Sequence, residues 1–407
     1  MAATNVQGRR QYSTRSSRIV QNVLPTMLLL NKDIRSAGFF TFFSRVPTLK
    51  TPQEKFLWDV DEYMSITDTS SAAVTGTTNT VIPVTTPKRW NIGDLWMNTR
   101  TGEVQFVESL AIGTSQVTVI RAVTALSSGG GTAAAAINSG DTFLQIATAA
   151  GEDNRRRTTM TTTPTEVFGY SQFFRWELEM SRRQVKREFE QGSERTYLME
   201  KRLNEARMEL NRAFLFGEKG RFTHPTEGDV TLTSGIRPIP TPNVYAAGGT
   251  LYEADFNEWL VEEGMRDGSM NKTLFASTDV LLAIHQMAGD RLQYSPATMS
   301  IGGTKVGFKL TEYLAPNGGT LMLVEDRAIT TAFNGEGYVV DMTELKRMIF
   351  SGNGYNDELH VVDDTGDKDD MGSTATLIGD MGLRWGFEQS HGKMSGVTGG
   401  AKGRSLS

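Results

Sequence analysis

The chain of 407 residues contains no cysteine, which excludes a disulfide framework, a thiolate metal site and a cysteine nucleophile. It has only four histidines, His224, His285, His360 and His391, with no His-x-x-x-His or Glu-x-x-His pairing. Histidines this far apart do not supply the ligands of a zinc site on one helix. The absence of cysteine also fits a reducing compartment.

Long hydrophobic runs are missing as well. The apolar stretch 27–30 is too short to cross a membrane, and the polar, basic start MAATNVQGRRQYSTRSS differs from an export signal. The net charge of −5 gives no general affinity for nucleic acids. With 38% hydrophobic and 22% charged residues, the composition is that of a soluble protein of two or three domains with no membrane partner.

Motifs for chemistry are scarce. The stretch DDTGDKDD at 363–370 is as acidic as a calcium loop, but Lys368 and Thr374 occupy the sixth and twelfth positions, where glycine and glutamate are needed. The glycine-bearing stretches GGTK and GNGYN complete no phosphate-binding fingerprint, and there is no Gly-x-Ser-x-Gly elbow. We therefore expect no enzyme, no catalytic or metal-binding residues, and no cofactor.

The first 45 residues form a basic block. They contain seven Lys or Arg against one Asp, and 7 − 1 gives a charge of +6. Apart from a possible short helix over 19–30, the block has few periodic signals, and it is either an extended arm or a disordered tail.

Composition changes between about 66 and 148, where Thr, Gly, Ala and Val dominate and charge is rare. Short strand patterns joined by tight turns predict a small all-β module, and Gly102 stands where a hairpin needs positive φ. We expect its core to include Trp90, Leu95, Trp96, Val104, Phe106, Val117, Val119, Phe143 and Ile146.

The segments on either side of this module have the alternation of strands. KFLWDVDEY and VFGYSQFFRWELEM predict that 56–63 and 167–180 are the two legs of one long hairpin. Between the module and the second leg lie Arg155, Arg156 and Arg157. They could bind phosphates, but Glu152 and Asp153 beside them favour a salt-bridging interface.

The stretch SERTYLMEKRLNEARMELNRAFLFG predicts one long helix over 194–216, with Ser193 as its N-cap and Gly217 at its end. Apolar residues recur at spacings of three and four. We expect its core side to include Met199, Leu203, Leu210 and Phe214. A coiled coil is possible, but fewer than four heptads and alanine in the stripe favour a spine helix packed across a domain.

Beyond the helix, mixed helix and strand patterns from 236 to 345 predict an α/β or α+β domain. Strand patterns return from 346 to 396, and we expect 397–407 to be a flexible tail.

Taken in order, these parts resemble the major capsid protein of tailed double-stranded DNA bacteriophages, which has the Hong Kong-97-type (HK-97-like) fold. The hairpin segments resemble the E-loop, and SERTYLMEKRLNEARMELNRAFLFG resembles the spine helix. NIGDLWMNTRTGEVQFVESLAIGTSQVTVIRAV resembles the β insertion that one branch carries in the E-loop. LKRMIFSGNGYNDELHVV resembles the return of the chain to the P-domain. The resemblance covers nearly the whole chain and contains no catalytic signature.

This resemblance implies an α+β, HK-97-like capsid fold. Its parts would be an N-terminal arm (1–45), an E-loop hairpin (46–180) with a small β-barrel-like domain inserted at 66–148, a P-domain (181–235 with the spine helix, then 346–396), an A-domain (236–345) and the tail. Candidate inter-subunit contacts are Arg155, Arg156, Arg157, Phe56 and Trp58.

The implied function is structural. Copies of the chain would self-assemble as pentamers and hexamers into an icosahedral virion capsid in the host cytoplasm. Further partners would be portal, scaffold and decoration proteins, and packaged DNA held by non-specific electrostatics. The alternatives are an encapsulin-like compartment shell and another phage structural protein with a β module.

Overall fold

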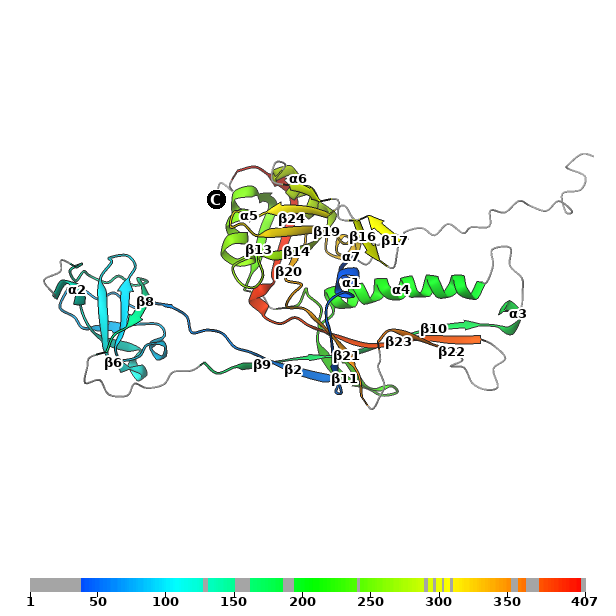
Figure 1. Cartoon of the computed structure of the whole chain (residues 1–407), viewed down its shortest axis with the longest axis horizontal. Coiled ribbons are helices and arrows are strands. Elements are labelled where there is room, and N and C mark those ends of the chain that lie inside the picture. The colour runs from blue at the N-terminus through cyan, green and yellow to red at the C-terminus, as the bar shows by residue number, and fades with distance from the viewer. Residues whose placement is uncertain are drawn as a thin grey trace, which may run out of the picture. The chain divides into compact units, whose positions relative to one another are not determined.

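The computed structural model describes residues 38–126, 131–150, 162–185, 194–239, 242–288, 292–295, 298–301, 304–307, 310–352, 358–363 and 373–403. They form a mixed α and β structure of two units (Figure 1). Unit 1 comprises Met1–Trp58 and Phe168–Ser407, and unit 2 comprises Asp59–Val167. Each unit has a hydrophobic cluster of its own.

Unit 1 contains a five-stranded sheet next to its longest helix, α4 (Glu194–Phe216). The strand order is β1 (Thr48–Thr51), β21 (Lys346–Phe350), β23 (Ser373–Arg384) and β10 (Gln172–Met180), and β22 (His360–Asp363) also pairs with β23. β1 is parallel to β21, and the other pairs are antiparallel. Phe174, Trp176 and Met180 alternate with exposed residues along β10, which gives this strand one buried face.

The second sheet of unit 1 has seven strands. Their order is β13 (Val244–Tyr252), β24 (Gly392–Ala401), β20 (Gly337–Val340), β14 (Asn271–Ala276), β19 (Thr320–Glu325), β18 (Leu310–Leu314) and β15 (Leu292–Ser295). The sheet is mixed, because β13 is parallel to β24 and β14 is parallel to β19. Three helices belong to the same part of the chain: α5 (Glu253–Trp259), which continues as a π-helical turn (Leu260–Gly264), α6 (Thr278–Ala288) and α7 (Arg327–Ala332).

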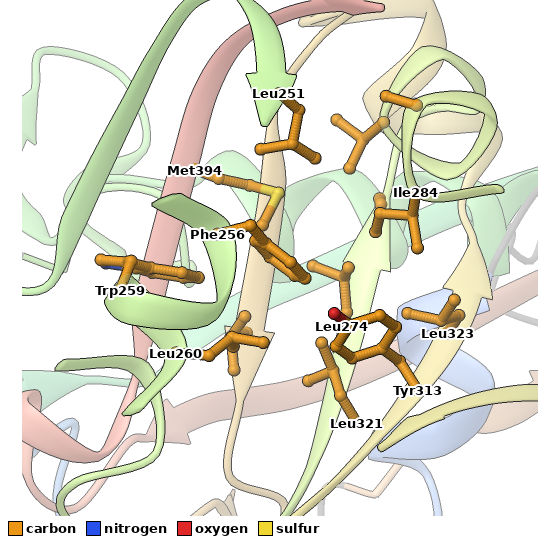
Figure 2. Close-up of a cluster of buried hydrophobic side chains, with 14 of the residues drawn as sticks. Leu251, Phe256, Trp259, Leu260, Leu274, Ile284, Tyr313, Leu321, Leu323 and Met394 are labelled. Atoms are coloured by element: carbon orange, nitrogen blue, oxygen red, sulfur yellow. The ribbon is translucent and has the colours of Figure 1, made fainter. Parts of the chain in front are cut away.

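The core of this region lies between the seven-stranded sheet and helices α5 and α6. Figure 2 shows part of it, with Phe256 and Trp259 from α5, Ile284 from α6 and Tyr313 from β18 pointing toward one another. Each of these side chains is buried. Burial of an aliphatic or aromatic side chain contributes about 1.5 to 3 kcal/mol, so this cluster is a main source of stability for unit 1.

The remaining elements of unit 1 are short. They are α1 (Gly38–Phe43), α3 (Arg182–Val185), a 3-10 turn (Glu388–Ser390), the hairpin of β11 (Gly220–His224) with β12 (Gly228–Leu232), and the hairpin of β16 (Thr298–Ile301) with β17 (Thr304–Gly307). β2 (Lys55–Val60) pairs with β9 (Thr165–Tyr170), and the boundary between the units falls within these two strands.

Unit 2 is a six-stranded antiparallel sheet that closes into a small barrel. The strand order is β3 (Thr67–Thr69), β8 (Thr142–Thr148), β5 (Asp94–Asn98), β6 (Val104–Ala111), β7 (Gln116–Ile120) and β4 (Val81–Pro83). The outermost strands meet through a bridge between Ser70 and Val84. Its short helical turns are Pro87–Arg89, Ile112–Thr114 and α2 (Val123–Leu126).

The interior of the barrel combines aromatic rings with satisfied polar groups. Trp96 packs edge-on against Trp90 at 4.5 Å between ring centroids and stacks on Phe143 at 4.6 Å. The Arg121 guanidinium donates two hydrogen bonds, of 2.6 and 2.7 Å, to the buried carboxylate of Glu103. Because both charges are partnered, this pair can be buried without leaving an uncompensated ion. Gly102 has φ of 72° in the β5–β6 turn, as the sequence predicted.

Two expectations about strands are wrong in part, and the closing strands divide between two sheets. The second hairpin leg, expected over 167–180, is interrupted at Ser171, where the chain leaves the β2–β9 pair and enters the five-stranded sheet as β10. The closing segment 346–396 does not stay in one sheet, because β24 joins the seven-stranded sheet between β13 and β20. The tail expected from 397 is strand as far as Ala401, since its partner β13 supplies a parallel ladder.

The expected core of the β module is also wrong in part. Trp90, Trp96, Val117, Val119 and Phe143 are buried inside the barrel. The other four residues of that set, Leu95, Val104, Phe106 and Ile146, are half-buried or exposed. In a strand, successive side chains point to opposite faces, and composition alone does not say which face is the interior.

Candidate functional site

Helix α4 is the element that the sequence predicted most closely, and it begins and ends at the expected residues, Glu194 and Phe216. Its 23 residues span about 35 Å at 1.5 Å per residue. The helix ends at Gly217, whose N–H donates to the Ala213 carbonyl at 2.9 Å. A side chain at position 217 would collide with that carbonyl, because a Cβ there would lie 2.5 Å from its oxygen.

The apolar stripe of α4 is buried over only half its length. Leu210 and Phe214 are fully buried, as expected, whereas Met199 and Leu203 are half-buried. The buried residues of the helix all lie in its C-terminal half and are Ala206, Leu210, Asn211, Phe214 and Leu215. The expectation of a core position is therefore wrong for Met199 and Leu203 in the isolated subunit. α1 and α7 contact α4, and both contacts involve its C-terminal half.

Helix α1 brings four phenylalanines to this half of α4. The Phe43 ring lies 4.6 Å from the Phe214 ring, between centroids. Phe39 and Phe42 pack edge-on against Phe275 of β14 at 5.1 and 5.6 Å. α1 is thus held between α4 and the seven-stranded sheet, which fixes the point where residues 1–37 join unit 1. Residues 1–37 themselves, most of the predicted N-terminal arm, lie outside the described residues.

A buried polar pair, Asn211 and Asp326, lies beside the phenylalanines. The Asn211 amide donates to both carboxylate oxygens of Asp326, at 3.0 and 3.1 Å, and its Oδ1 accepts the Phe40 N–H at 2.8 Å. Asp326 also accepts the Phe39 N–H at 2.9 Å and caps α7 through the Ala328 N–H at 2.8 Å. Burial raises the pKa of the Asp326 carboxyl, against the effect of these hydrogen bonds. The pair joins α1, α4 and α7 in one network.

The aromatic residues of β2 have an internal role. The Trp58 indole N–H donates to the Gly386 carbonyl at 3.1 Å, and its ring packs edge-on against Trp385 at 5.2 Å. The Phe56 ring lies so close to Gly169 and Gly382 that a Cβ at either position would come within 3 Å of it. Both side chains are at most 5% exposed. Both side chains therefore pack within their own subunit, and their expected role as inter-subunit contacts stays a prediction.

The other contact candidates, Arg155, Arg156 and Arg157, lie outside the described residues.

A polar groove of about 890 Å³ borders the exposed face of β10. Its charged lining residues are Glu54, Glu177, Glu227, Asp229, Asp380, Arg175 and Arg202. Arg175 lies 2.5 Å from Glu177, and both side chains are more than half exposed. Phe173, which also lines the groove, is 54% exposed. Exposed ion pairs beside an exposed ring suit contact with another macromolecule rather than catalysis.

Two buried ionisable groups in unit 1 have structural roles. Lys272 donates from Nζ to three carbonyls, of Gly264, Asp267 and Ser390, at 2.7 to 2.9 Å. His391 is fully buried, and burial lowers its pKa to about 4. Its Nε2 is 2.7 Å from the Trp385 carbonyl and its Nδ1 accepts the Asp341 N–H at 3.3 Å. Both side chains hold adjoining loops together.

Over the described ranges, no group of three or more His, Asp or Glu side chains is arranged to hold a metal ion. No helix within these ranges is long and apolar enough to span a membrane.

A family model described as the SU10 major capsid protein matches residues 35–398 of the chain. The chain belongs to this family. A major capsid protein is the subunit that is repeated in a viral shell, so this one is a structural, self-associating component of the virion capsid and is not an enzyme.

Solved structures similar to this capsid protein include chains from two mycobacteriophages and an encapsulin. The chain from Mycobacterium phage Bobi is 12% identical, with 98% of this chain and 100% of that chain covered and a TM-score of 0.48. The chain from Mycobacterium phage Cain is 11% identical, with 95% of this chain and 98% of that chain covered and a TM-score of 0.48. The chain from the holo-SrpI encapsulin complex of Synechococcus elongatus PCC 7942 is 9% identical, with 98% of this chain and 100% of that chain covered and a TM-score of 0.45. No curated protein matches the sequence. Identities and TM-scores this low transfer no function, so the assignment rests on the family match.

Sequence reasoning missed the packing of α1 against α4 and the Asn211–Asp326 pair in this capsid protein. The run GFFTFF, with four phenylalanines in six residues, was a readable signal for a buried segment at 38–43. Asp326 stands immediately before a helix, which is a usual N-cap position. Asn211 gave no signal, because a single polar residue beside an apolar stripe is more often exposed than buried.

Proposed function

We propose that this capsid protein builds a closed icosahedral head of pentamers and hexamers through an HK-97-like fold, assembled in the host cytoplasm, and that the head encloses the double-stranded DNA of a tailed phage. The observation that best supports this proposal is helix α4. Its C-terminal half is buried, while its N-terminal half keeps Met199 and Leu203 only half-covered. Such a half-covered spine suits a subunit that is completed by its neighbours.

The parts of the proposed fold correspond to the two sheets and to unit 2. The five-stranded sheet with α4 would be the P-domain, and the seven-stranded sheet with α5 and α6 would be the A-domain. The β2–β9 pair would be the E-loop, with the barrel of unit 2 as its inserted domain. Residues 1–45 would be the N-terminal arm, whose root is α1.

Contacts between subunits would be numerous and individually weak. Arg155, Arg156 and Arg157 would form ion pairs with a neighbouring copy, and the groove beside β10 offers carboxylates such as Glu54 and Glu227. Exposed ion pairs are each worth about 0 to 1 kcal/mol and weaken with salt. A shell held in this way gains its stability from the number of contacts.

Other partners would meet the shell at defined places. The basic first 45 residues, with their charge of +6 from 7 − 1, would bind DNA phosphates without reading sequence. Portal, scaffold and decoration proteins would complete the head.

Electron microscopy of the purified protein tests the proposal. We expect closed shells with five-fold vertices, carrying DNA when isolated from infected cells. Open sheets, tubes or fibres would count against the head. Closed shells filled with protein instead of DNA would support the encapsulin-like alternative.

A further inference from the structure

The barrel of unit 2 carries a continuous apolar face on its outside. One row of neighbouring side chains crosses the strands β8, β5 and β6 as Leu144, Met97 and Val104. The next row crosses β8, β5, β6 and β7 as Ala147, Leu95, Phe106 and Ile120. The two rows define the outer apolar face.

These side chains point away from the barrel interior. On β5 the buried residues Trp96 and Asn98 alternate with half-buried Leu95 and Met97. On β7 the buried residue Val119 is followed by Ile120, which is 39% exposed. An antiparallel sheet usually alternates apolar residues inside with polar residues outside. On this face the outward residues are apolar too, which marks an interaction surface.

Charge is nearly absent from the surface of the barrel. Residues 66–148 contain nine charged side chains, and six of them are buried: Asp68, Arg89, Asp94, Glu103, Arg121 and Asp141. Lys88 and Glu108 are exposed, and Arg100 is paired with Asp141 at 2.7 Å. Neither row of the outer apolar face contains a charged residue. Depletion of charge with retention of an aromatic ring is typical of the centre of an interface.

We propose that the outer apolar face of one subunit packs against the same face of a second copy. A two-fold contact brings each surface against itself, so any charge at its centre would meet its own like charge. The uncharged face avoids this repulsion, whereas an acidic or basic partner would find no counter-charge on it. The inference rests on the proposed shell, which brings many copies together.

The absence of cysteine in the chain allows a direct test. A single cysteine is placed in turn at Leu95, Phe106 and Ile120 of the full-length protein, and assembled particles are oxidised. A disulfide needs two Cα atoms within about 7 Å, so the position nearest the two-fold axis should give about tenfold more covalent dimer than Ile92→Cys, which is exposed but lies outside the two rows. No excess at any face position would overturn the pairing, as would cross-linking to a different protein.

A pair of charge variants gives an independent readout. Val81→Lys combined with Ile120→Lys puts two like charges on and beside the face, at side chains that are 43% and 39% exposed and so tolerate substitution. We expect the yield of particles to fall at least about tenfold, because like charges across a contact are costly. The matched control, Ile92→Lys with Ile112→Lys, adds the same charge to exposed sites outside the two rows and should assemble normally. Equal yields from both variants would overturn the pairing.

The wild-type protein distinguishes a failure of the face pairing from a failure of the proposed shell. If the wild-type protein forms particles but none of the three cysteine variants gives face cross-links, the pairing alone is refuted, whereas a wild type that forms no particles would refute the shell itself.

Discussion

At the scale of single residues, Asn211 links two separate parts of unit 1. It sits inside unit 1, where its amide group bonds Asp326 on one side and the Phe40 N–H on the other. A hydrophobic residue of similar size would fit the space, but it would leave those partners without hydrogen bonds. Buried polar groups left in this way cost far more than an average hydrogen bond contributes.

We therefore expect Asn211→Leu to lower the local stability of α1 by about 2 to 4 kcal/mol. Hydrogen exchange of the peptide 38–46 measures this directly, because the Phe39 and Phe40 amides belong to the network. The control is Asn204→Leu on the same helix, at a half-buried position, which should change exchange by less than about 0.5 kcal/mol. Equal exchange in the two variants would show that the network does not hold α1.

A second residue-scale prediction concerns acid and His391. Burial holds its pKa at about 4, below the value of about 6.5 in an unfolded chain. As the pH falls, the unfolded chain therefore takes up the proton before the folded one. The contribution of His391 to the free energy of unfolding is fully present above pH 6.5 and decreases by about 3 kcal/mol toward pH 4.

We expect His391→Gln to reduce the loss of subunit stability between pH 6.5 and 4. Thermal melting of unassembled subunits across this pH range measures the effect. His285→Gln, at an exposed position of α6, should leave the slope unchanged. If the stability of the His391→Gln variant still falls as steeply between pH 6.5 and 4, other groups cause the acid sensitivity.

At the scale of elements, α4 has two halves that differ in their surroundings. The C-terminal half carries Leu210 and Phe214 into contact with α1 and the five-stranded sheet. The N-terminal half carries the same kind of stripe, but Met199 and Leu203 remain half-buried. The same substitution should therefore have different consequences along one helix.

Leu210→Asp should prevent soluble folding, because it buries an unpaired charge. Leu203→Asp should leave a folded subunit that is less stable by about 1 to 2 kcal/mol and assembles poorly. Solubility, melting temperature and particle yield distinguish the two outcomes, and Glu205→Gln serves as a nearly neutral control. Equal loss of folding in both leucine variants would mean that α4 is uniformly buried.

The elements also show which parts of the fold could be predicted from the sequence. The bounds of α4 and the turn at Gly102 follow from periodicity and turn residues, which are local signals. The partners of the strands were harder to predict. Nothing near Gly392 indicates that β24 inserts between β13 and β20, because that choice depends on packing against residues far away in the chain. The Asn211–Asp326 pair could not be predicted for the same reason, because 115 residues separate its members.

At the scale of the whole molecule, the chain consists of two units with separate hydrophobic clusters. The chain enters unit 2 after β2 and returns through β9, and these strands pair with each other. Units with their own cores are expected to fold as separate cooperative transitions.

Replacing 66–148 by a short Gly-Ser turn should therefore leave unit 1 folded. We expect unchanged hydrogen exchange in α4 and in the seven-stranded sheet, and shells that form but dissociate at lower temperature, because contacts made by the barrel are lost. Electron microscopy and thermal melting measure both effects. Loss of folding in the remaining chain would show that the two units depend on each other.

The closure of the barrel has a consequence for crowded assemblies. In a shell, identical strands are held a few nanometres apart for the life of the particle, and an open sheet edge there could recruit a neighbour's strand and seed a fibre. The bridge between Ser70 and Val84, with the hydrogen bonds from the Ser71 N–H to the Pro83 carbonyl and from the Thr85 N–H to the Thr69 carbonyl, joins β3 to β4. The barrel can therefore change its outward side chains, and with them its partners, while its backbone stays closed to strand exchange.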